Sequence, residues 1–429
     1  MTPDSDHPQR YATVNELHAR PFPALDVPCT AVVMAFKEPE DAAGRDRAQD
    51  RAHLLDLIDR HGGAHPQPEA THYSGPMGRA ELKWESHTEF VTYSAFSPGL
   101  SARPFDPAEA EIFPADWIAA APGRRLAALL IRIEPMPASM GEIFVRAEDW
   151  FVPESLAISK VVDGAAVIAG DFRIDPAGHM RFAVFVRPGT GRRRVGRILQ
   201  RLCEIEVYRA MSMLGLMRAR DLTGHLNRLD PRLSDLVAGL DTPAGGPAPE
   251  AVLHDLLSIS AELERLAVRV SFRFGATAAY EAILNQRIQV LREERIEGRQ
   301  TFGEFMMRRY DPAMRTVKSA EKRLHALSER AERAAELLRT RVDVDRSAQN
   351  QRLLESMDRR ADLALRLQHT VEGLSVVAIS YYAVSLASYA LYPLAKLAGL
   401  GKEALTAALV LPVLALVWLG LRRIKRSFH

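Results

Sequence analysis

The sequence predicts an α+β domain, mainly an antiparallel sheet with helices, that continues into long antiparallel coiled-coil-like helices and a C-terminal two-helix transmembrane hairpin. Three observations predict this order. Short apolar runs with tight turns come first, heptad spacing follows a stretch rich in proline and glycine, and two long apolar segments come last. The predicted segments are a cytoplasmic domain at 1–240, a linker at 241–250, a helical stalk at 251–372, the hairpin at 373–421 and a basic cytoplasmic tail at 422–429.

Composition agrees with a globular protein that carries a membrane segment. Of the 429 residues, 47% are apolar and 26% are charged, which excludes a disordered chain. Only two cysteines occur, Cys29 and Cys203, and this fits a reducing compartment better than a disulfide framework. The net charge of +2 by itself points to no class of partner.

The first part of the chain reads as strands with one helix among them. The pair Asp163-Gly164 and the run Asp175 to Gly178 separate the last three strands, and such tight turns favour antiparallel hairpins over a doubly wound parallel sheet. An acidic opening and helical spacing of apolar residues predict an amphipathic helix at 40–60. Strands are expected at 29–37, 79–85, 88–96, 125–134, 155–162, 165–175 and 180–187.

From Gly191 onward the sequence predicts helix almost throughout. A first helix is expected up to a turn rich in methionine and leucine at 213–217, and a second one at 225–240. The stretch from Asp241 to Pro249 holds three prolines and two glycines in nine residues, which is typical of a linker. We therefore place the domain boundary there.

Two heptad series follow the linker and predict two long antiparallel helices. The reversal between them is expected at 298–310, and a helix continuous from Pro312 to Ala395 would join the stalk to the first membrane span. The second series has alanine at several seam positions, which bury little area, so either oligomerisation or an intramolecular bundle has to complete the packing. The series are Val252, Leu256, Ile259, Leu263, Leu266, Val270, Leu284, Ile288 and Leu291, then Val317, Ala320, Leu324, Leu327, Ala331, Ala334 and Leu338, resuming in shifted phase at Leu354, Met357, Ala361 and Ala364.

Two segments near the C-terminus are long enough to cross a bilayer. The ranges 373–395 and 404–421 contain no charged residue, and at about 1.5 Å per residue each approaches or exceeds a hydrocarbon core of about 30 Å. Arg422, Arg423, Lys425 and Arg426 directly follow the second range. The positive-inside rule then predicts that both termini are cytoplasmic.

A search for catalytic chemistry finds no familiar motif. The chain contains no His-Glu-x-x-His, no phosphate-binding glycine loop, no Gly-x-Ser-x-Gly and no Cys-x-x-Cys. His61 and His65 lack a third ligand at a defined spacing, so we expect no metal. We predict no catalytic residue and no cofactor, and a non-enzymatic role is favoured.

Two short polar-aromatic stretches are the main candidate sites. Each places an acid, a base and an imidazole within a few residues, as either a ligand pocket or a structural ion-pair network requires. The pairs Glu16 with His18 and Glu85 with His87 are the first to test. The candidate residues are Asn15, Glu16, His18 and Arg20 in one stretch, and Trp84, Glu85, His87 and Glu89 in the other.

Basic residues crowd the start of the helix predicted after Gly191. A solvated face is one interpretation, and a contact with an anionic lipid or a phosphate ligand at Arg192–Arg201 is the other. No aromatic residues interleave this run as a nucleic-acid surface would require, so we expect no nucleic-acid partner. The run comprises Arg192, Arg193, Arg194, Arg197 and Arg201.

Hydroxyl side chains recur along one side of the first predicted span. Tyr381, Ser385, Ser388 and Tyr392 follow steps of four, three and four, and hydroxyls in hydrocarbon need partners. A helix–helix interface is one interpretation and a hydrated path between protomers is the other. Neither span contains an acid or a base, which argues against a proton relay.

The chain resembles a bacterial family of uncharacterised, membrane-anchored proteins, domain of unknown function 3422. The resemblance extends over nearly the full length, and it implies attachment to the bacterial inner membrane but brings no reaction, substrate or catalytic residue. It rests on His7 to Arg10, Asn15 to Phe22, Trp84 with His87 to Phe90, Val161 to Gly164, Asp171 to Arg173 and Gln200 to Glu206.

The order of segments is also similar to that of CorA-type cation channels. Those channels end their first span with Gly-Met-Asn, whereas this chain has Tyr389 to Pro393 there, without that tripeptide. The favoured function is therefore a membrane-anchored, oligomeric scaffold or ligand sensor that acts through its stalk. The alternative is an ion channel or transporter of CorA-like layout that lacks the Gly-Met-Asn filter.

Overall fold

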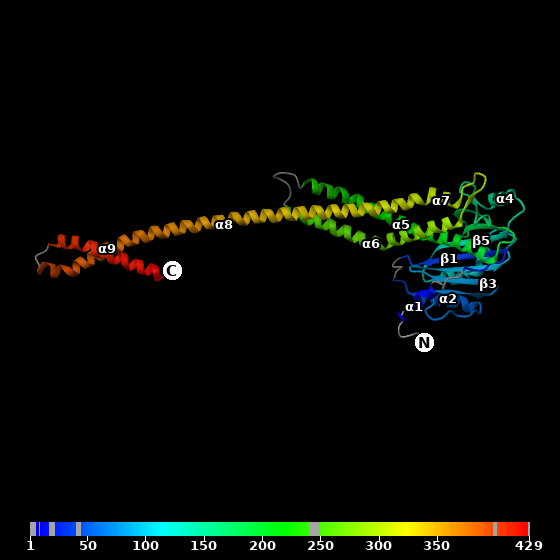
Figure 1. Cartoon of the computed structure of the whole chain (residues 1–429), viewed down its shortest axis with the longest axis horizontal. Coiled ribbons are helices and arrows are strands. Elements are labelled where there is room, and N and C mark those ends of the chain that lie inside the picture. The colour runs from blue at the N-terminus through cyan, green and yellow to red at the C-terminus, as the bar shows by residue number, and fades with distance from the viewer. Residues whose placement is uncertain are drawn as a thin grey trace. The chain divides into compact units, whose positions relative to one another are not determined.

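The computed structural model describes residues 6–7, 9–16, 22–39, 44–239, 249–397 and 401–427 (Figure 1). These residues fall into two units. Unit 1 contains the described residues up to Gly239 together with 254–334, and unit 2 contains 249–253 together with the described residues from Ala335 onward. Most of the predicted linker lies outside the described residues, and its last two positions already belong to a helix.

A nine-stranded sheet forms the centre of unit 1, in the order β2-β3-β4-β1-β5-β8-β7-β6-β9. All neighbouring strands pair antiparallel except β5 and β8, which are parallel. The strands are β1 (Cys29–Lys37), β2 (His72–Met77), β3 (Ala80–Ser86), β4 (Phe90–Pro98), β5 (Arg124–Pro135), β6 (Ala157–Val161), β7 (Ala166–Ile174), β8 (Met180–Val186) and β9 (Glu294–Arg295).

The predicted α+β class is confirmed, and so is each predicted strand, with shifts of a few residues at the ends. Two edge strands were not predicted. β2 contains Gly75 and Pro76 and lacks a continuous apolar pattern, which an edge position tolerates, and β9 has only two residues, both charged. The parallel pairing of β5 with β8 also differs from a purely antiparallel sheet, because the chain crosses through α4 (Met140–Trp150) and the β6–β7 hairpin before it returns.

The main apolar core lies on one face of the sheet, under α2 (Arg47–Arg60), α3 (Ala115–Ala119) and α4. His53 of α2 stacks on Trp117 of α3 with ring centroids 4.0 Å apart. Its Nδ1 lies 3.0 Å from the hydroxyl of Tyr93, and its Nε2 lies 2.9 Å from the carbonyl oxygen of Trp117. Burial lowers the pKa of His53, so the imidazole serves this core in its neutral form.

Long helices cover the other face of the sheet (Figure 1). The first, α5, is continuous from Arg192 to Gly239, so the turn expected at 213–217 is helical. Leu216, Leu222, Leu226 and Leu229 are buried at helical spacing, and this continuous apolar stripe holds the helix together through Pro231. The remaining helices are α1 (Arg10–Glu16), η2 (Pro107–Ile112), α6 (Pro249–Leu291), α7 (Phe302–Arg309), α8 (Asp311–Leu397) and α9 (Lys402–Ser427).

Most residues of the two predicted heptad series up to Leu338 are buried because α5, α6 and α8 pack as a bundle within one chain, whereas the residues of the shifted phase from Leu354 onward are exposed. The hydroxyl of Tyr310 donates a hydrogen bond of 2.8 Å to Ser212 Oγ of α5. Lys318 of α8 lies 2.8 Å from Glu281 of α6, and Arg323 of α8 lies 3.0 Å from Asp230 of α5. For the alanines up to Ala334, an intramolecular bundle therefore supplies the partners.

Unit 2 contains the end of α8 and α9. The helix α8 has no break from Asp311 to Leu397, as the sequence predicts. Two helical segments are long and apolar enough to cross a membrane, one at the end of α8 and one at Lys402–Gly420. Lys402 Nζ lies 5.1 Å from the ring centre of Tyr389, which brings the start of α9 back against α8.

Candidate functional site

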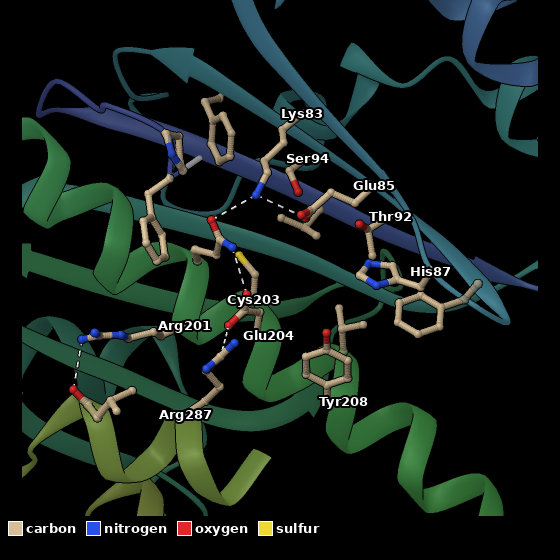
Figure 2. A pocket seen from close by; sticks show the side chains of 18 residues that line it. Lys83, Glu85, His87, Thr92, Ser94, Arg201, Cys203, Glu204, Tyr208 and Arg287 are labelled. Carbon is tan, nitrogen blue, oxygen red and sulfur yellow. Dashed lines mark hydrogen bonds and ion pairs between the residues drawn. The ribbon is translucent and has the colours of Figure 1, made fainter. Parts of the chain in front are cut away.

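A cavity of about 340 Å³ lies in unit 1 between the sheet and the helices α5 and α6 (Figure 2). This volume falls in the range of about 300–1,000 Å³ that is typical of small-molecule sites. Residues from β1, β3, β4, α5 and α6 and from the segment before β1 meet around it. The cavity is therefore built from parts of the chain that are far apart in sequence.

The sheet wall of the cavity is polar because β3 and β4 alternate. Lys83 and Glu85 of β3 line the cavity, and Lys83 Nζ lies 3.2 Å from Glu85. Trp84, between them, points to the opposite face and is buried in the apolar core. On β4, Thr92 and Ser94 line the cavity in the same alternating way. Successive side chains of a strand point to opposite faces, so one strand pair serves both the core and the cavity.

A chain of hydrogen bonds crosses the cavity from the sheet to both helices. Lys83 Nζ donates to Gln200 Oε1 of α5 at 3.0 Å, and Gln200 Nε2 donates to Glu204 Oε1 at 2.9 Å. Glu204 in turn forms an ion pair with Arg287 of α6. Figure 2 shows these side chains converging from three elements. Both carboxylates that line the cavity, Glu85 and Glu204, therefore have a cationic partner.

Arg201 is the exception in the cavity wall. Its Nη1 donates a hydrogen bond of 3.0 Å to the carbonyl oxygen of Val290, and within the described ranges no carboxylate forms an ion pair with it. Burial and the charges of Arg197, Arg287 and Arg292 lower its pKa. A half-buried guanidinium among other guanidinium groups is a position where an anion would be stabilised.

The cavity wall combines this charge with apolar surface. Three cationic side chains and two carboxylates line the cavity, which leaves a net charge of +1 while the imidazole is neutral. A ligand with an anionic group and an apolar body matches that composition. The ionisable side chains are Lys83, Glu85, His87, Arg201, Glu204 and Arg287, and the apolar ones are Phe22, Pro23, Val33, Phe90, Phe96, Val207 and Val290, with Tyr208 and Cys203 beside them.

The segment before β1 closes one side of the cavity. Phe22 and Pro23 line it, and Leu25 donates a backbone hydrogen bond of 3.3 Å to the carbonyl oxygen of Arg192 at the start of α5. This approach requires a glycine at position 196, because a Cβ there would clash with the carbonyl oxygen of Pro23, well inside 3.0 Å. Gly196 therefore allows the segment to lie directly on α5.

A second polar cluster lies at the start of β4, next to the cavity. Glu89 is fully buried, and Arg273 of α6 binds both of its oxygens, with Nη1 3.0 Å from Oε1. Lys37 Nζ of β1 lies 3.7 Å from Glu89, and Tyr280 is a further hydrogen-bond partner. Burial raises the pKa of Glu89, but Arg273, Tyr280 and Lys37 outweigh this, so the pKa lies below its ordinary value.

The residues predicted around Trp84 separate into three environments. Glu85 and His87 line the cavity, Glu89 forms the buried cluster, and Trp84 belongs to the core on the opposite face. The ring of His87 stacks on Phe90 with centroids 4.2 Å apart. The stretch therefore contributes both to a pocket and to a structural ion-pair network, the two interpretations that the sequence leaves open.

The other predicted stretch is only partly described. Asn15 and Glu16 are the last residues of the helix α1, but the structure does not describe their side chains. His18 and Arg20 lie outside the described residues. Their relation to the cavity therefore stays a prediction.

His65 Nε2 lies 2.5 Å from Asp59 Oδ1, and among the described residues no group of three metal-ligating side chains occurs.

The hydroxyl residues of the first apolar segment do not share one environment. Ser388 is buried, together with Ser380. Tyr381 is 70% exposed and Tyr392 is 38% exposed, and Ser385 is half-buried between them. Lys402 at the start of α9 lies over the ring of Tyr389, which is also exposed, so the exposed tyrosines include one that contacts α9.

Arg287 is the functional candidate that the sequence did not reveal. It lies in a heptad region of α6, where a charged residue is ordinarily solvated, and nothing in its neighbourhood marks it. Arg201 and Glu204 could have been found from the sequence, because the arginine run and the stretch Gln200 to Glu206 both stand out there. Only the packing of α6 against α5 brings the three together.

Comparison with models of protein families gives a match over nearly the whole chain, to a family of unknown function. The model of the family "Protein of unknown function (DUF3422)" matches residues 5–428. No curated protein matches the chain.

Proposed function

Since the chain belongs to the DUF3422 family, to which no function is attached, we propose that the protein is a membrane-anchored sensor that binds a small organic anion in the cavity at Arg201. The observation that carries the proposal is the half-buried Arg201, whose guanidinium forms no ion pair within the described ranges, although the charge of Glu204 acts on it. Arginine binds carboxylate and phosphate groups with two parallel hydrogen bonds, so it is well suited to this role.

Membrane attachment is supported by the two apolar helical segments in unit 2. The cluster from Arg422 to Arg426 after the second segment supports an orientation with both termini in the cytoplasm. Unit 1 would then lie in the cytoplasm, where small organic anions are abundant. The localisation that follows is the inner membrane of a bacterium.

A sensing role is supported by the elements that share the cavity. Arg201 lies on α5 and Arg287 on α6, so a bound anion would change the balance of charge between these helices. The same helices bind α8 in unit 1 through Glu281 and Asp230. Because α8 continues without a break into the apolar segment, it offers a direct connection from ligand to membrane. A scaffold that binds no ligand would not account for the cavity.

The proposal is tested by the binding of benzoate to the full chain in detergent. Benzoate carries one carboxylate on an apolar ring, benzamide is its neutral analogue, and benzylamine is a cation of the same size. We expect benzoate at 100 times its dissociation constant to stabilise unit 1 by about 2.7 kcal/mol, and the two analogues to have no effect. Thermal unfolding followed by tryptophan fluorescence, with isothermal titration calorimetry, measures both quantities.

A matched pair of variants tests whether the cavity is the site. Arg201→Met should lose benzoate binding by at least tenfold, because the cationic group is gone while the aliphatic part remains. Arg193→Met, at the exposed start of the same helix, should bind as the wild type does. Equal benzamide and benzoate binding, or equal losses in the two variants, would contradict the proposal. Unchanged melting of the unliganded variants is the control for folding.

A further inference from the structure

A long part of α8 in unit 2 has no covering partner within the described chain. Every residue from Asp343 to Val371 is exposed, although large apolar side chains recur there. Leu353 is 63% exposed, Leu354 and Met357 are each 66% exposed, and Val371 is 57% exposed. An isolated helix with an apolar stripe ordinarily buries that stripe against another element.

One series of residues in this part follows heptad spacing, whereas the exposed Leu363, Leu365 and Leu367 lie outside it. Steps of three and four connect Leu354, Met357, Ala361, Ala364, Gln368 and Val371, which we call the α8 seam. The opposite side of the helix carries Glu355, Asp358, Arg359, Asp362 and Arg366. Small alanines in the middle of the seam permit close approach of a second helix, and one polar residue at a seam position is typical of a coiled coil with a fixed register.

The same steps lead from the α8 seam into the apolar segment. Beyond Val371 they reach Ser375 and Ala378 and then Tyr382, Ser385 and Tyr389. Tyr382 is 67% exposed, and Tyr389 is 68% exposed although Lys402 Nζ lies 5.1 Å from its ring centre. Among the residues that the structure describes, no hydrogen-bond partner is found for the hydroxyls of Tyr382 and Ser385. A hydroxyl inside hydrocarbon needs such a partner. The buried hydroxyls of Ser380 and Ser388, on another side of the helix, also lack one within the described chain, so the apolar segment leaves hydroxyls unpartnered on more than one side.

We propose that the α8 seam binds the α8 seam of a second copy of this chain, in parallel and in register. The inference rests on the membrane attachment proposed above but not on anion binding. A bilayer surface is excluded as the cover, because α8 runs without a break from the seam into the apolar segment and so projects away from the membrane. A second copy, anchored in the same way, presents the same residues at the same distance from the bilayer, on a helix that runs in the same direction.

The charges of the segment agree with a copy of itself as the partner. Between Arg341 and Glu372 there are six basic and six acidic residues, so two parallel copies meet without net repulsion. An acidic or basic foreign partner would be favoured by an excess of the opposite charge, which the segment lacks. The polar and apolar parts of the interface would then follow one helix face from the cytoplasm into the bilayer.

Disulfide cross-linking in native membranes tests the proposal. Ala361→Cys places a thiol in the seam, whereas Arg359→Cys places one on the opposite, charged side, and both positions are exposed. After oxidation with copper phenanthroline, we expect at least a tenfold higher yield of cross-linked dimer for Ala361→Cys. The wild type, whose Cys29 and Cys203 are buried, sets the background.

Further measurements keep the result unambiguous. Ala364→Cys is a second seam variant in case the first one fails to fold, and the mass of the wild type in detergent gives the oligomeric state independently. A monomeric mass with background cross-linking overturns the proposal and points to a foreign partner. Equal yields at positions 359 and 361 also overturn it, because they indicate random collisions in the membrane.

Discussion

Replacing Arg273 by methionine is expected to destabilise unit 1 by about 3–5 kcal/mol, the typical cost of leaving one partner of a buried ion pair uncompensated. Glu89 is fully buried, and Arg273 is its only partner that binds both carboxylate oxygens in the described structure. The pair connects the start of β4 to α6, so its loss weakens the contact between the sheet and the helices. Thermal and denaturant unfolding followed by the fluorescence of Trp84, Trp117 and Trp150 measures the change.

The pH dependence of this variant distinguishes lost charge pairing from lost packing. The pKa of Glu89 is lowered in the folded protein, so its contribution is fully present above the ordinary carboxyl value of 4.5 and is lost as the pH falls through the lower folded value. Without Arg273 the carboxyl should take up its proton at higher pH, so the loss of stability relative to the wild type should shrink in acid. Arg269→Met, exposed one turn earlier on α6, should change stability by less than about 0.5 kcal/mol. A comparable loss in that control, or a loss independent of pH, would count against the pairing.

Replacing Gly196 by alanine is the second change for which we expect a large effect. A Cβ at this position would clash with the carbonyl oxygen of Pro23, so the segment that closes the cavity has to move. Overpacking of this kind costs about 1–3 kcal/mol, which exceeds the gain of up to about 1 kcal/mol from the better helix propensity of alanine. We expect a lower melting temperature and weaker benzoate binding.

Gly224 provides the matched control for that variant. It lies in the same helix, and a Cβ added there would meet no heavy atom within 4 Å apart from its chain neighbours and the backbone of its own helix. Gly224→Ala should therefore raise stability by up to about 1 kcal/mol and leave benzoate binding unchanged. If both alanine variants were stabilised alike, the close contact between Pro23 and α5 would not exist in solution.

Periodicity explains what could be predicted of the fold. The alternation in β3 and β4 and the tight turns around Asp163-Gly164 are local features, so the strands and the β6–β7–β8 order follow from the sequence. The parallel contact of β5 with β8 depends on a crossover, and β9 depends on a return of the chain to Ser159 from the end of α6. Long-range pairings of this kind leave no local pattern. The continuity of α5 also required knowledge of the helix that buries its stripe.

The candidate site shows the same division between local and long-range information. Glu85 and His87 were predicted because acid, base and imidazole stand together in the sequence, and both line the cavity. The arginine run indicated an anion at Arg192–Arg201, but only the packing distinguishes Arg201, which lines the cavity, from the exposed Arg193. Arg287 became a candidate only through its ion pair with Glu204.

The most direct test of the central claim is a crystal structure of the full chain with 4-bromobenzoate. The bromine atom gives an anomalous signal that locates the ring directly. We predict one bromine peak inside the cavity beside Phe90 and Phe96, with the carboxylate within hydrogen-bond distance of the Arg201 guanidinium. A cavity without the peak at saturating ligand, or a carboxylate bound away from Arg201, would contradict the account.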